Sequence, residues 1–253
     1  TPYSSDKSHN IFLPRIGASW EFSSGYSVFA QASTGISDPT AFEIVNPEDG
    51  QIADLDSEEA IGAEAGVRAE ISKDANLILT FYHQIVNSAI LQIVQENDAI
   101  AFENVEGGLE MNGIEFELNY NFKEHLKLRA YGALSLHYFG EETDYPYNAL
   151  PGSPKSSAGL QVWSQFNWGS INLDYRYIGE TPLNNEGTST MESYMVLNSS
   201  VVVNLQKNIV FEIGANNLLD SNYTDWPQLN GVYGKFYNPA PPRTAYVSIR
   251  WSI

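Results

Sequence analysis

The sequence predicts an all-β protein: part of a transmembrane antiparallel β-barrel with about eleven strands. Three observations support this. Apolar and polar residues alternate with a period of two, which sorts side chains onto the two faces of a strand. Aromatic residues make up 13% and charged residues only 17% of the chain, whereas soluble domains carry roughly 25% charged residues. Short turns also alternate with long loops, as they do in outer-membrane barrels.

The alternation is clearest between residues 113 and 120, where Ile114, Phe116 and Leu118 alternate with Glu115 and Glu117. Segments 58–71, 170–177 and 246–253 repeat the pattern. We expect strands at about 11–22, 26–34, 58–71, 76–92, 109–122, 126–140, 155–167, 170–180, 192–205, 208–218 and 242–253.

The connections between these strands alternate in length. Short turns fall at 23–25, 72–75, 123–125, 168–169 and 206–207, and long loops at 35–57, 93–108, 141–154, 181–191 and 219–241. The loops hold most of the prolines. We therefore expect a bacterial outer-membrane location with extracellular loops, periplasmic turns and a periplasmic C-terminus.

An odd number of consecutive antiparallel strands leaves the first and last strands running in the same direction. Such a sheet cannot close on itself with antiparallel pairing throughout. Unpaired edges are costly in lipid, because their backbone groups find no hydrogen-bond partner. The sequence therefore predicts a partial barrel that another stretch of polypeptide completes.

Composition excludes several functional classes. The net charge of −18 argues against nucleic acid as a partner. The absence of cysteine excludes disulfides and thiolate metal sites, and no apolar stretch is long enough for a transmembrane helix. The chain has no H-E-x-x-H, G-x-S-x-G or P-loop motif, and its four histidines are scattered. We predict no enzyme activity, no catalytic residue and no metal site.

A series of short motifs follows the strands in order. These are Asp38-Pro39-Thr40 with Glu43; Leu55, Glu58, Glu64, Gly66 and Arg68; Asn104; Gly113-Ile114-Glu115; Leu150-Pro151-Gly152-Ser153-Pro154; Asn216-Asn217-Leu218-Leu219-Asp220 with Tyr223; and Pro242-Arg243. Together they resemble the C-terminal half of TonB-dependent outer-membrane receptors, especially the ferric-siderophore branch. Ser57 replaces a usual proline, and Ile253 stands where an aromatic residue is common.

The resemblance implies a 22-stranded barrel filled by a plug domain, of which residues 1–253 form the C-terminal part. It implies active import of a scarce metal chelate, with a ferric siderophore favoured, by TonB-coupled rearrangement of the plug. The expected partners are the N-terminal half of the barrel with its plug, a TonB-type energising complex, and lipid with lipopolysaccharide. We expect no intrinsic cofactor, and the ferric chelate is the transported ligand. Cleavage of a longer precursor in an external loop is the expected origin of the chain, and a separately encoded half is the alternative.

Two groups of residues are candidates for binding. The first group faces the lumen and is predicted to contact the plug, with ordinary solvated lining as the alternative; it consists of Glu64, Arg68, Glu70, Glu115, Glu117, Arg129, Asp174, Arg176, Glu212 and Arg250. The second group comprises external-loop aromatics that could stack on a ligand, with loop packing as the alternative; it consists of Tyr145, Tyr147, Trp226, Tyr233, Phe236 and Tyr237. Asp54, Asp56 and Glu58 could supply oxygens to Ca²⁺, although a solvated charged loop is the favoured interpretation.

Other functions remain open at this point. One is a passive porin or surface-binding barrel, which predicts an open pore without a plug. Another is a TonB-dependent receptor for cobalamin, haem, a copper chelate or an oligosaccharide. An outer-membrane lipase or protease would need a nucleophile and a base in one site, and the sequence shows no such pair.

Overall fold

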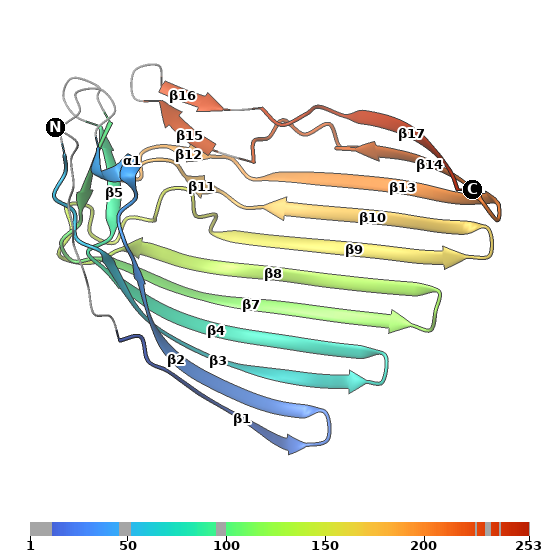
Figure 1. Ribbon diagram of the computed structural model, residues 1–253, viewed down its shortest axis with the longest axis horizontal. Helices are drawn as coiled ribbons and strands as arrows, with labels where there is room; N and C mark the ends of the chain where they lie inside the picture. The colour runs from blue at the N-terminus through green and yellow to red at the C-terminus, as the bar shows by residue number, and fades with distance from the viewer. Residues whose placement is uncertain are drawn as a thin grey trace.

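The computed structural model describes residues 12–45, 52–94, 100–225, 227–230, 234–237 and 239–252. Its main element is a sheet of 11 strands in the order β1-β2-β3-β4-β7-β8-β9-β10-β13-β14-β17 (Figure 1). Every neighbouring pair in this sheet is antiparallel. The all-β fold predicted from the sequence is confirmed, and so is the number of wall strands.

The strands of the main sheet are mostly long, as a membrane-spanning wall requires. They are β1 (Arg15–Ser23), β2 (Tyr26–Ser37), β3 (Glu58–Ser72), β4 (Ala75–Asn87), β7 (Leu109–Phe122), β8 (Leu126–Phe139), β9 (Ser156–Phe166), β10 (Gly169–Ile178), β13 (Tyr194–Gln206), β14 (Ile209–Asn216) and β17 (Thr244–Trp251).

The remaining elements lie in the long connections, at the end of the sheet opposite the tight turns (Figure 1). They are the helix α1 (Ala41–Ile44) and three hairpins: β5 (Ile90–Val94) with β6 (Ile100–Asn104), β11 (Thr181–Pro182) with β12 (Thr190–Met191), and β15 (Pro227–Asn230) with β16 (Gly234–Tyr237). This end of the sheet is called the loop end below, and the opposite end the turn end. Within the described residues, no helix is long and apolar enough to cross a membrane.

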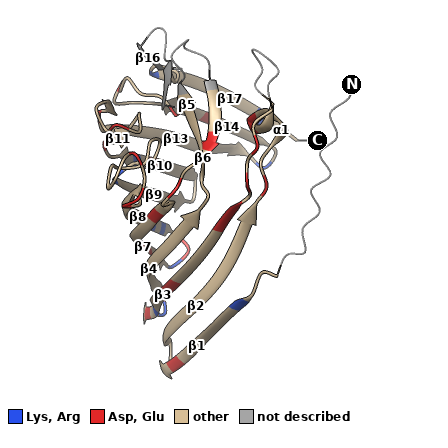
Figure 2. Ribbon diagram, turned by 90° about the vertical axis from the view of Figure 1, so that its left-hand side faces the viewer, with Lys and Arg blue, Asp and Glu red and all other residues tan. Residues whose placement is uncertain are grey.

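The sheet curves into an arc, with β1 and β17 at its two ends (Figure 2). Because all pairs are antiparallel and the strands number 11, β1 and β17 run in the same direction. Within the described chain neither edge strand has a second strand beside it. The arc is therefore an open wall, as the strand count predicts.

Several predicted strand ends differ from the structure by two to five residues: the strand expected over 11–22 begins at Arg15, and the one expected over 26–34 continues to Ser37. Two strands that end early have a local cause. The strand expected over 76–92 stops at Asn87, because Ser88 adopts φ 51° and the chain turns into the β5–β6 hairpin. The strand expected over 208–218 stops at Asn216, because Asn217 adopts φ 50°. Left-handed residues break the extended ladder, and asparagine tolerates that conformation better than most residues.

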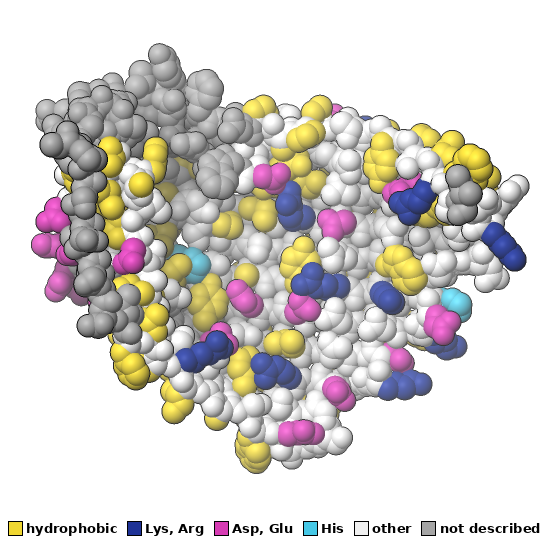
Figure 3. Space-filling view, viewed as in Figure 1, with side chains coloured by type: hydrophobic (Ala, Val, Ile, Leu, Met, Phe, Trp, Pro, Cys, Tyr) yellow, Lys and Arg dark blue, Asp and Glu magenta, His cyan; other side chains and the backbone are white. Residues whose placement is uncertain are grey.

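The ladder registers sort the side chains onto two faces. Large apolar residues on the convex face remain open, including Trp20 at 68%, Leu136 at 67% and Ile249 at 70% exposure. Charged side chains of both signs are spread over the concave face (Figure 3). The few buried apolar residues include Phe139, Leu55 and Leu150, all at the loop end. The sheet thus has an apolar side that its own described residues leave uncovered, as a lipid-facing wall requires.

Aromatic side chains gather at the turn end of the convex face. Phe166 stacks on Trp168 with ring centroids 5.1 Å apart, and Tyr120 stacks on Phe122 at 6.2 Å. Trp20 lies 5.9 Å from Phe22, at the turn between β1 and β2. Such a girdle is typical of the boundary between hydrocarbon and headgroups.

Opposite faces of one strand should respond differently to the same charge. Leu79 on β4 pairs with Phe116 and points outward, and its neighbour Thr80 pairs with Glu115 and points into the lumen. We expect Leu79→Arg to lower the free energy of unfolding of the intact barrel by about 2–4 kcal/mol, because it places a charge near the middle of the apolar band.

Thr80→Arg is the matched control and is expected to cost far less, since its guanidinium can stay in the polar lumen. Denaturant unfolding of the full receptor in detergent or lipid measures both variants. Equal losses for the two variants would contradict the assignment of the faces.

Candidate functional site

The predicted lumen charges all lie on one face of the sheet. The registers place Glu64 opposite Tyr82, Glu115 opposite Thr80 and Glu117 opposite Tyr131. The same alternation carries this face across the remaining strands. The charges found on it are Glu64, Arg68, Glu70, Glu115, Glu117, Arg129, Asp174, Arg176, Glu212 and Arg250. Their contact with a plug remains a prediction.

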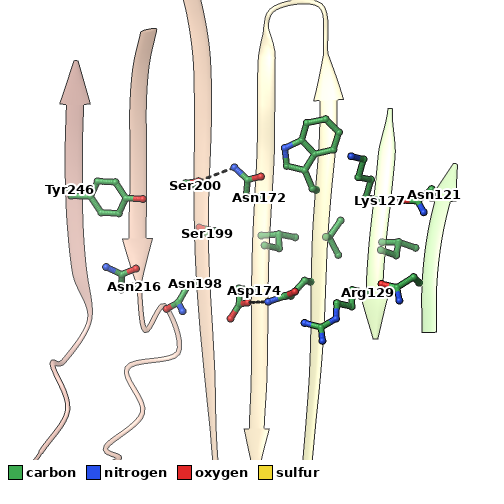
Figure 4. Close-up of a pocket in the computed structure, with 16 residues that line it drawn as sticks. Asn121, Lys127, Arg129, Asn172, Asp174, Asn198, Ser199, Ser200, Asn216 and Tyr246 are labelled. Atoms are coloured by element: carbon green, nitrogen blue, oxygen red, sulfur yellow. Dashed lines mark hydrogen bonds between the residues drawn. The ribbon is translucent and has the colours of Figure 1, made fainter. Parts of the chain in front are cut away.

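Two neighbouring cross-strand rows form the most developed part of this face, a groove with a volume of about 490 Å³ (Figure 4). One row runs Asn119, Arg129, Gln161, Asp174, Asn198 and Asn216. The other row contains Asn121, Lys127, Trp163, Asn172, Ser200 and Tyr246. The groove thus presents mainly amides and hydroxyls with a few charges among them, which is chemistry suited to binding polypeptide backbone.

Hydrogen bonds between the strands hold the groove side chains in place. Gln161 Nε2 donates to Asp174 Oδ2 at 2.8 Å, and Asn172 Nδ2 donates to Ser200 Oγ at 3.1 Å (Figure 4). Within β7, Asn119 Nδ2 also donates to Glu117 Oε1 at 2.7 Å. These amide and hydroxyl residues are absent from the sequence-derived candidates. The signal that could have found them is the same alternation, which puts them on the charged face.

Carboxylates and aromatic rings engage several lumen cations. Arg129 bonds Glu117 at 2.6 Å, with about half to two-thirds of each side chain shielded from solvent (45% and 34% exposed). The Arg68 guanidinium lies 3.9 Å from the centroid of the Phe29 ring, and Lys127 lies 5.1 Å from that of Trp163. Ion pairs at this exposure contribute about 0–1 kcal/mol each. Their effect is to fix where each charge points.

Glycines opposite tyrosines let the tyrosine rings lie flat against the lumen face of the sheet. A Cβ added at Gly159 would lie 2.2 Å from Cζ of Tyr131, and one at Gly113 would lie 2.3 Å from Cζ of Tyr82. These tyrosine rings therefore lie against the wall, over the backbone of the next strand. Glycine is required at both positions because of this close approach.

The first two long loops are joined to each other. Asn104, at the end of β6, accepts from the Asp56 N–H at 2.7 Å and donates to the carbonyls of Asp56 at 3.0 Å and Ser88 at 2.7 Å. Glu58 accepts from the Ile90 N–H at 2.8 Å, and the Phe42 ring meets the Phe102 ring edge-on at 5.7 Å. The loops over β2 to β7 therefore form one connected unit.

A capping box begins the helix inside the first of these loops. The Thr40 hydroxyl accepts from the Glu43 N–H at 3.4 Å, and the Glu43 carboxylate accepts from the Thr40 N–H at 2.6 Å. The two residues satisfy each other's free helix-end groups. The P-T-x-x-E motif of the sequence analysis is thus a local folding signal.

The asparagine motif after β14 has a comparable structural role. Asn217 is 1% exposed, accepts from the Ser221 N–H at 3.0 Å and donates to the Ser221 carbonyl at 2.9 Å. Asp220 accepts from the Arg243 N–H at 3.1 Å, and the Arg243 guanidinium lies 3.4 Å from its second oxygen. The motif therefore holds the start of the last loop next to the start of β17.

His137 joins the wall to another loop. Its Nε2 lies 2.8 Å from the Tyr82 hydroxyl, and its Nδ1 lies 2.8 Å from Ser153 Oγ. Ser153 belongs to the L-P-G-S-P motif, whose Leu150 is buried. A serine beside a histidine is also found in hydrolases, but the contact here ties the loop to β8 and β4.

The predicted aromatic candidates fall in three places. Tyr145 packs on the fully buried Phe139 at 5.4 Å, whereas Tyr147 is 62% exposed and lies 6.5 Å from Tyr138 on the convex side. Phe236 and Tyr237 lie on β16. Trp226 and Tyr233 lie outside the described residues. Ligand stacking by this set remains a prediction.

The Tyr147 phenol stays neutral over a wider pH range than usual. Desolvation raises its pKa first, and the nearby carboxylates of Glu141 and Glu110 raise the pKa further. Tyr147 therefore acts as a neutral ring and hydroxyl at physiological pH.

The acidic segment proposed for Ca²⁺ takes part in the loop contacts. The Glu58 carboxylate accepts a hydrogen bond from the Ile90 N–H, and the Asp56 N–H donates to the Asn104 side chain. Among the described residues, no three acidic, histidine or cysteine side chains are grouped as they would be around a metal ion.

A single-layer arc with a polar concave face, an uncovered apolar convex face and an aromatic girdle defines part of the wall of an outer-membrane β-barrel. The family described as "TonB dependent receptor-like, beta-barrel" matches residues 1–218. The chain therefore belongs to the TonB-dependent receptors, whose members are outer-membrane transport proteins rather than enzymes. No curated protein matches the chain.

Solved structures share the fold at low sequence identity. The ferric yersiniabactin uptake receptor FyuA from Yersinia pestis superposes with a TM-score of 0.80 at 19% identity, over 94% of this chain and 37% of that one. The siderophore receptor PiuA from Acinetobacter baumannii gives 0.75 at 19% identity, over 94% and 35%. The copper transporter OprC gives 0.75 at 16% identity, over 94% and 39%. The chain thus spans well under half the length of these proteins, and its 11 strands fit half of such a barrel.

The join between the first two loops can be tested at one residue. We expect Asn104→Ala to speed amide hydrogen exchange at Asp56 about tenfold or more, because it removes bonds whose loss costs about 1–3 kcal/mol. Hydrogen-exchange mass spectrometry on the full receptor measures this.

Asn148→Ala is the control, since the Asn148 side chain donates to the Asn185 carbonyl, in a connection that does not include Asp56. It should leave Asp56 exchange unchanged. Unchanged exchange in Asn104→Ala itself would show that the two loops hold their positions independently.

Proposed function

We propose that this chain forms half the wall of a plugged 22-stranded outer-membrane receptor that imports a scarce metal chelate. A ferric siderophore is the favoured substrate. The observation that carries the proposal is the groove-bearing polar concave face, within a family of outer-membrane transport receptors. Three similar structures are a ferric yersiniabactin uptake receptor, a siderophore receptor and a ferric citrate transporter.

The two open edges support a wall completed by further strands. Each edge strand keeps a row of backbone donors and acceptors that hydrocarbon cannot satisfy. Because β1 and β17 run in the same direction, the closing stretch must contribute an odd number of strands. A second set of eleven, supplied by the N-terminal half of the same barrel, meets both conditions.

The concave face supports contact with a plug. Its amides, hydroxyls and oriented charges offer many modest hydrogen bonds to a folded domain in the lumen. Weak and solvated contacts of this kind let such a domain be displaced, since each bond is exchanged for one with water at small net cost. In this proposal an energised TonB-type complex supplies the displacement through the plug.

The aromatic girdle supports the orientation. It lies at the tight turns, so the turns sit at one membrane interface and the long loops extend beyond the other. We assign the turns and the C-terminal strand end to the periplasm and the loops to the exterior. Capture then falls to the loops and the plug apex.

A passive porin shares the wall but lacks the plug, and a receptor for another ligand shares both. The copper transporter among the similar structures shows that one fold accommodates different cargo. The wall residues therefore favour the receptor class more strongly than any single ligand.

Uptake measurements separate these functions. We expect cells carrying the full receptor to accumulate a ferric chelate, and deletion of the energising complex to abolish that accumulation. The purified receptor should bind the chelate with micromolar or better affinity.

Planar-bilayer recordings provide the second readout. A plugged receptor should show no large steady conductance, whereas a porin would conduct continuously. Accumulation that persists without energy coupling, together with steady conductance, would contradict the receptor function and support a passive porin.

A further inference from the structure

A hydrogen-bonded row of polar side chains interrupts the apolar convex face. His83 on β4 lies opposite Asn112 on β7, and Glu110 on β7 lies opposite Tyr138 on β8. All four share the convex side with the apolar residues Phe116 and Leu136. We call His83, Asn112, Tyr138 and Glu110 the outer polar cluster.

The hydrogen bonds of this cluster run in one direction. The Asn112 amide donates from Nδ2 to the Tyr138 hydroxyl at 3.1 Å, so its Oδ1, 2.6 Å from His83 Nδ1, accepts a hydrogen bond from the imidazole Nδ1–H. Tyr138 in turn donates to Glu110 Oε2 at 2.8 Å. Two acceptors are left over, His83 Nε2 in the tautomer with its proton on Nδ1 and the second carboxylate oxygen of Glu110, together with one donor, the second N–H of the Asn112 amide.

The cluster lies where the apolar band should end. On β7, Phe122 belongs to the aromatic girdle, and Asn112 lies ten residues nearer the loop end. At about 3.3 Å per residue and a tilt of about 40°, that separation is roughly 25 Å along the membrane normal. This equals the usual height of the apolar band. The cluster is therefore at headgroup depth on the loop side.

An exposed ring adjoins the cluster. Tyr147 is 62% exposed and lies 6.5 Å from Tyr138, so its ring is open beside the row, while its hydroxyl bonds the Glu141 carboxylate. The outward positions of β4, β7 and β8 hold no Lys or Arg in these described strands. Acceptors beside an aromatic ring, without cations, suit a ligand rich in hydroxyl and amide donors and disfavour a phosphate.

We propose that the outer polar cluster, with Tyr147, binds the sugar headgroup of an outer-leaflet glycolipid, the lipopolysaccharide of the bacterial surface. Sugar hydroxyls and amide N–H groups donate to Glu110 and His83, and the Tyr147 ring covers an apolar sugar face. This inference rests on the proposed location and orientation of the receptor. It assigns the lipid contact to one place on the wall, apart from the transport pathway.

The test uses the full receptor in lipid nanodiscs that contain phosphatidylglycerol and a lipopolysaccharide carrying only the inner sugars. Native mass spectrometry counts the lipopolysaccharide retained per receptor. We expect His83→Leu/Glu110→Leu to reduce retention at least fivefold. Glu115→Leu, which changes a lumen carboxylate on the same strand as Glu110, should leave retention unchanged. Equal retention in the double variant and the unaltered receptor would overturn the proposal.

A second pair of probes identifies the group recognised. Dephosphorylated lipopolysaccharide should bind as well as the intact form, and phosphatidylglycerol should not compete. Loss of binding on dephosphorylation would overturn the assignment to sugar. Should the double variant fail to fold, His83→Leu alone, at an exposed position, should lower retention about twofold or more, and no change there would overturn the proposal.

Chelate uptake keeps this outcome separate from that of the proposed function. Reduced glycolipid retention with unchanged uptake supports a lipid site outside the transport pathway. Selective retention in a receptor that transports no chelate would leave the lipid site standing and remove only the transport assignment.

Discussion

The register of one backbone ladder is the constraint on which the rest of the wall depends. Because side chains alternate on a strand, a slip of one residue would turn every carboxylate of the lumen toward hydrocarbon. The 11 strands keep register such that Glu117 and Arg129 meet on the concave face and Phe116 points outward. The same backbone bonds remove the polar main chain from lipid everywhere except at the two edges. Those edges explain why the arc needs further strands.

Function is distributed unequally over this frame. The concave face carries oriented but solvent-accessible polar groups, which suits contact with a domain that must be able to move. At the loop end, hydrogen bonds fix individual side chains. Asn104 joins two loops, Asn217 holds the start of the last loop, and His137 bonds Ser153. A rim with such contacts can hold side chains in place for ligand binding, and in the proposed mechanism displacement is left to the plug.

The alternation in the sequence predicted the class of fold, the strand count and the face of every proposed lumen charge, because a period of two is a direct consequence of strand geometry. It failed where a single backbone angle decides the outcome: the left-handed Ser88 and Asn217 end two strands that the apolar pattern would extend. The amide and hydroxyl residues of the groove were missed because single Asn, Gln and Ser residues carry no signal by themselves. Only the register between neighbouring strands aligns them into rows. Two motifs could be interpreted only from the structure. Thr40 and Glu43 form a capping box, and the buried Asn217 bonds the backbone of Ser221.

The most direct test of the central claim is the solvent environment of consecutive β7 side chains in a membrane. The chain has no cysteine, so a nitroxide can be attached at single introduced cysteines from Ile114 to Tyr120, provided that the rest of the receptor is likewise free of reactive thiols. In the full receptor in bilayers, collisions with oxygen should be high at Ile114, Phe116, Leu118 and Tyr120, and collisions with a water-soluble nickel chelate should be higher at the residues between them. Accessibility to both reagents that shows no period of two would contradict the membrane wall.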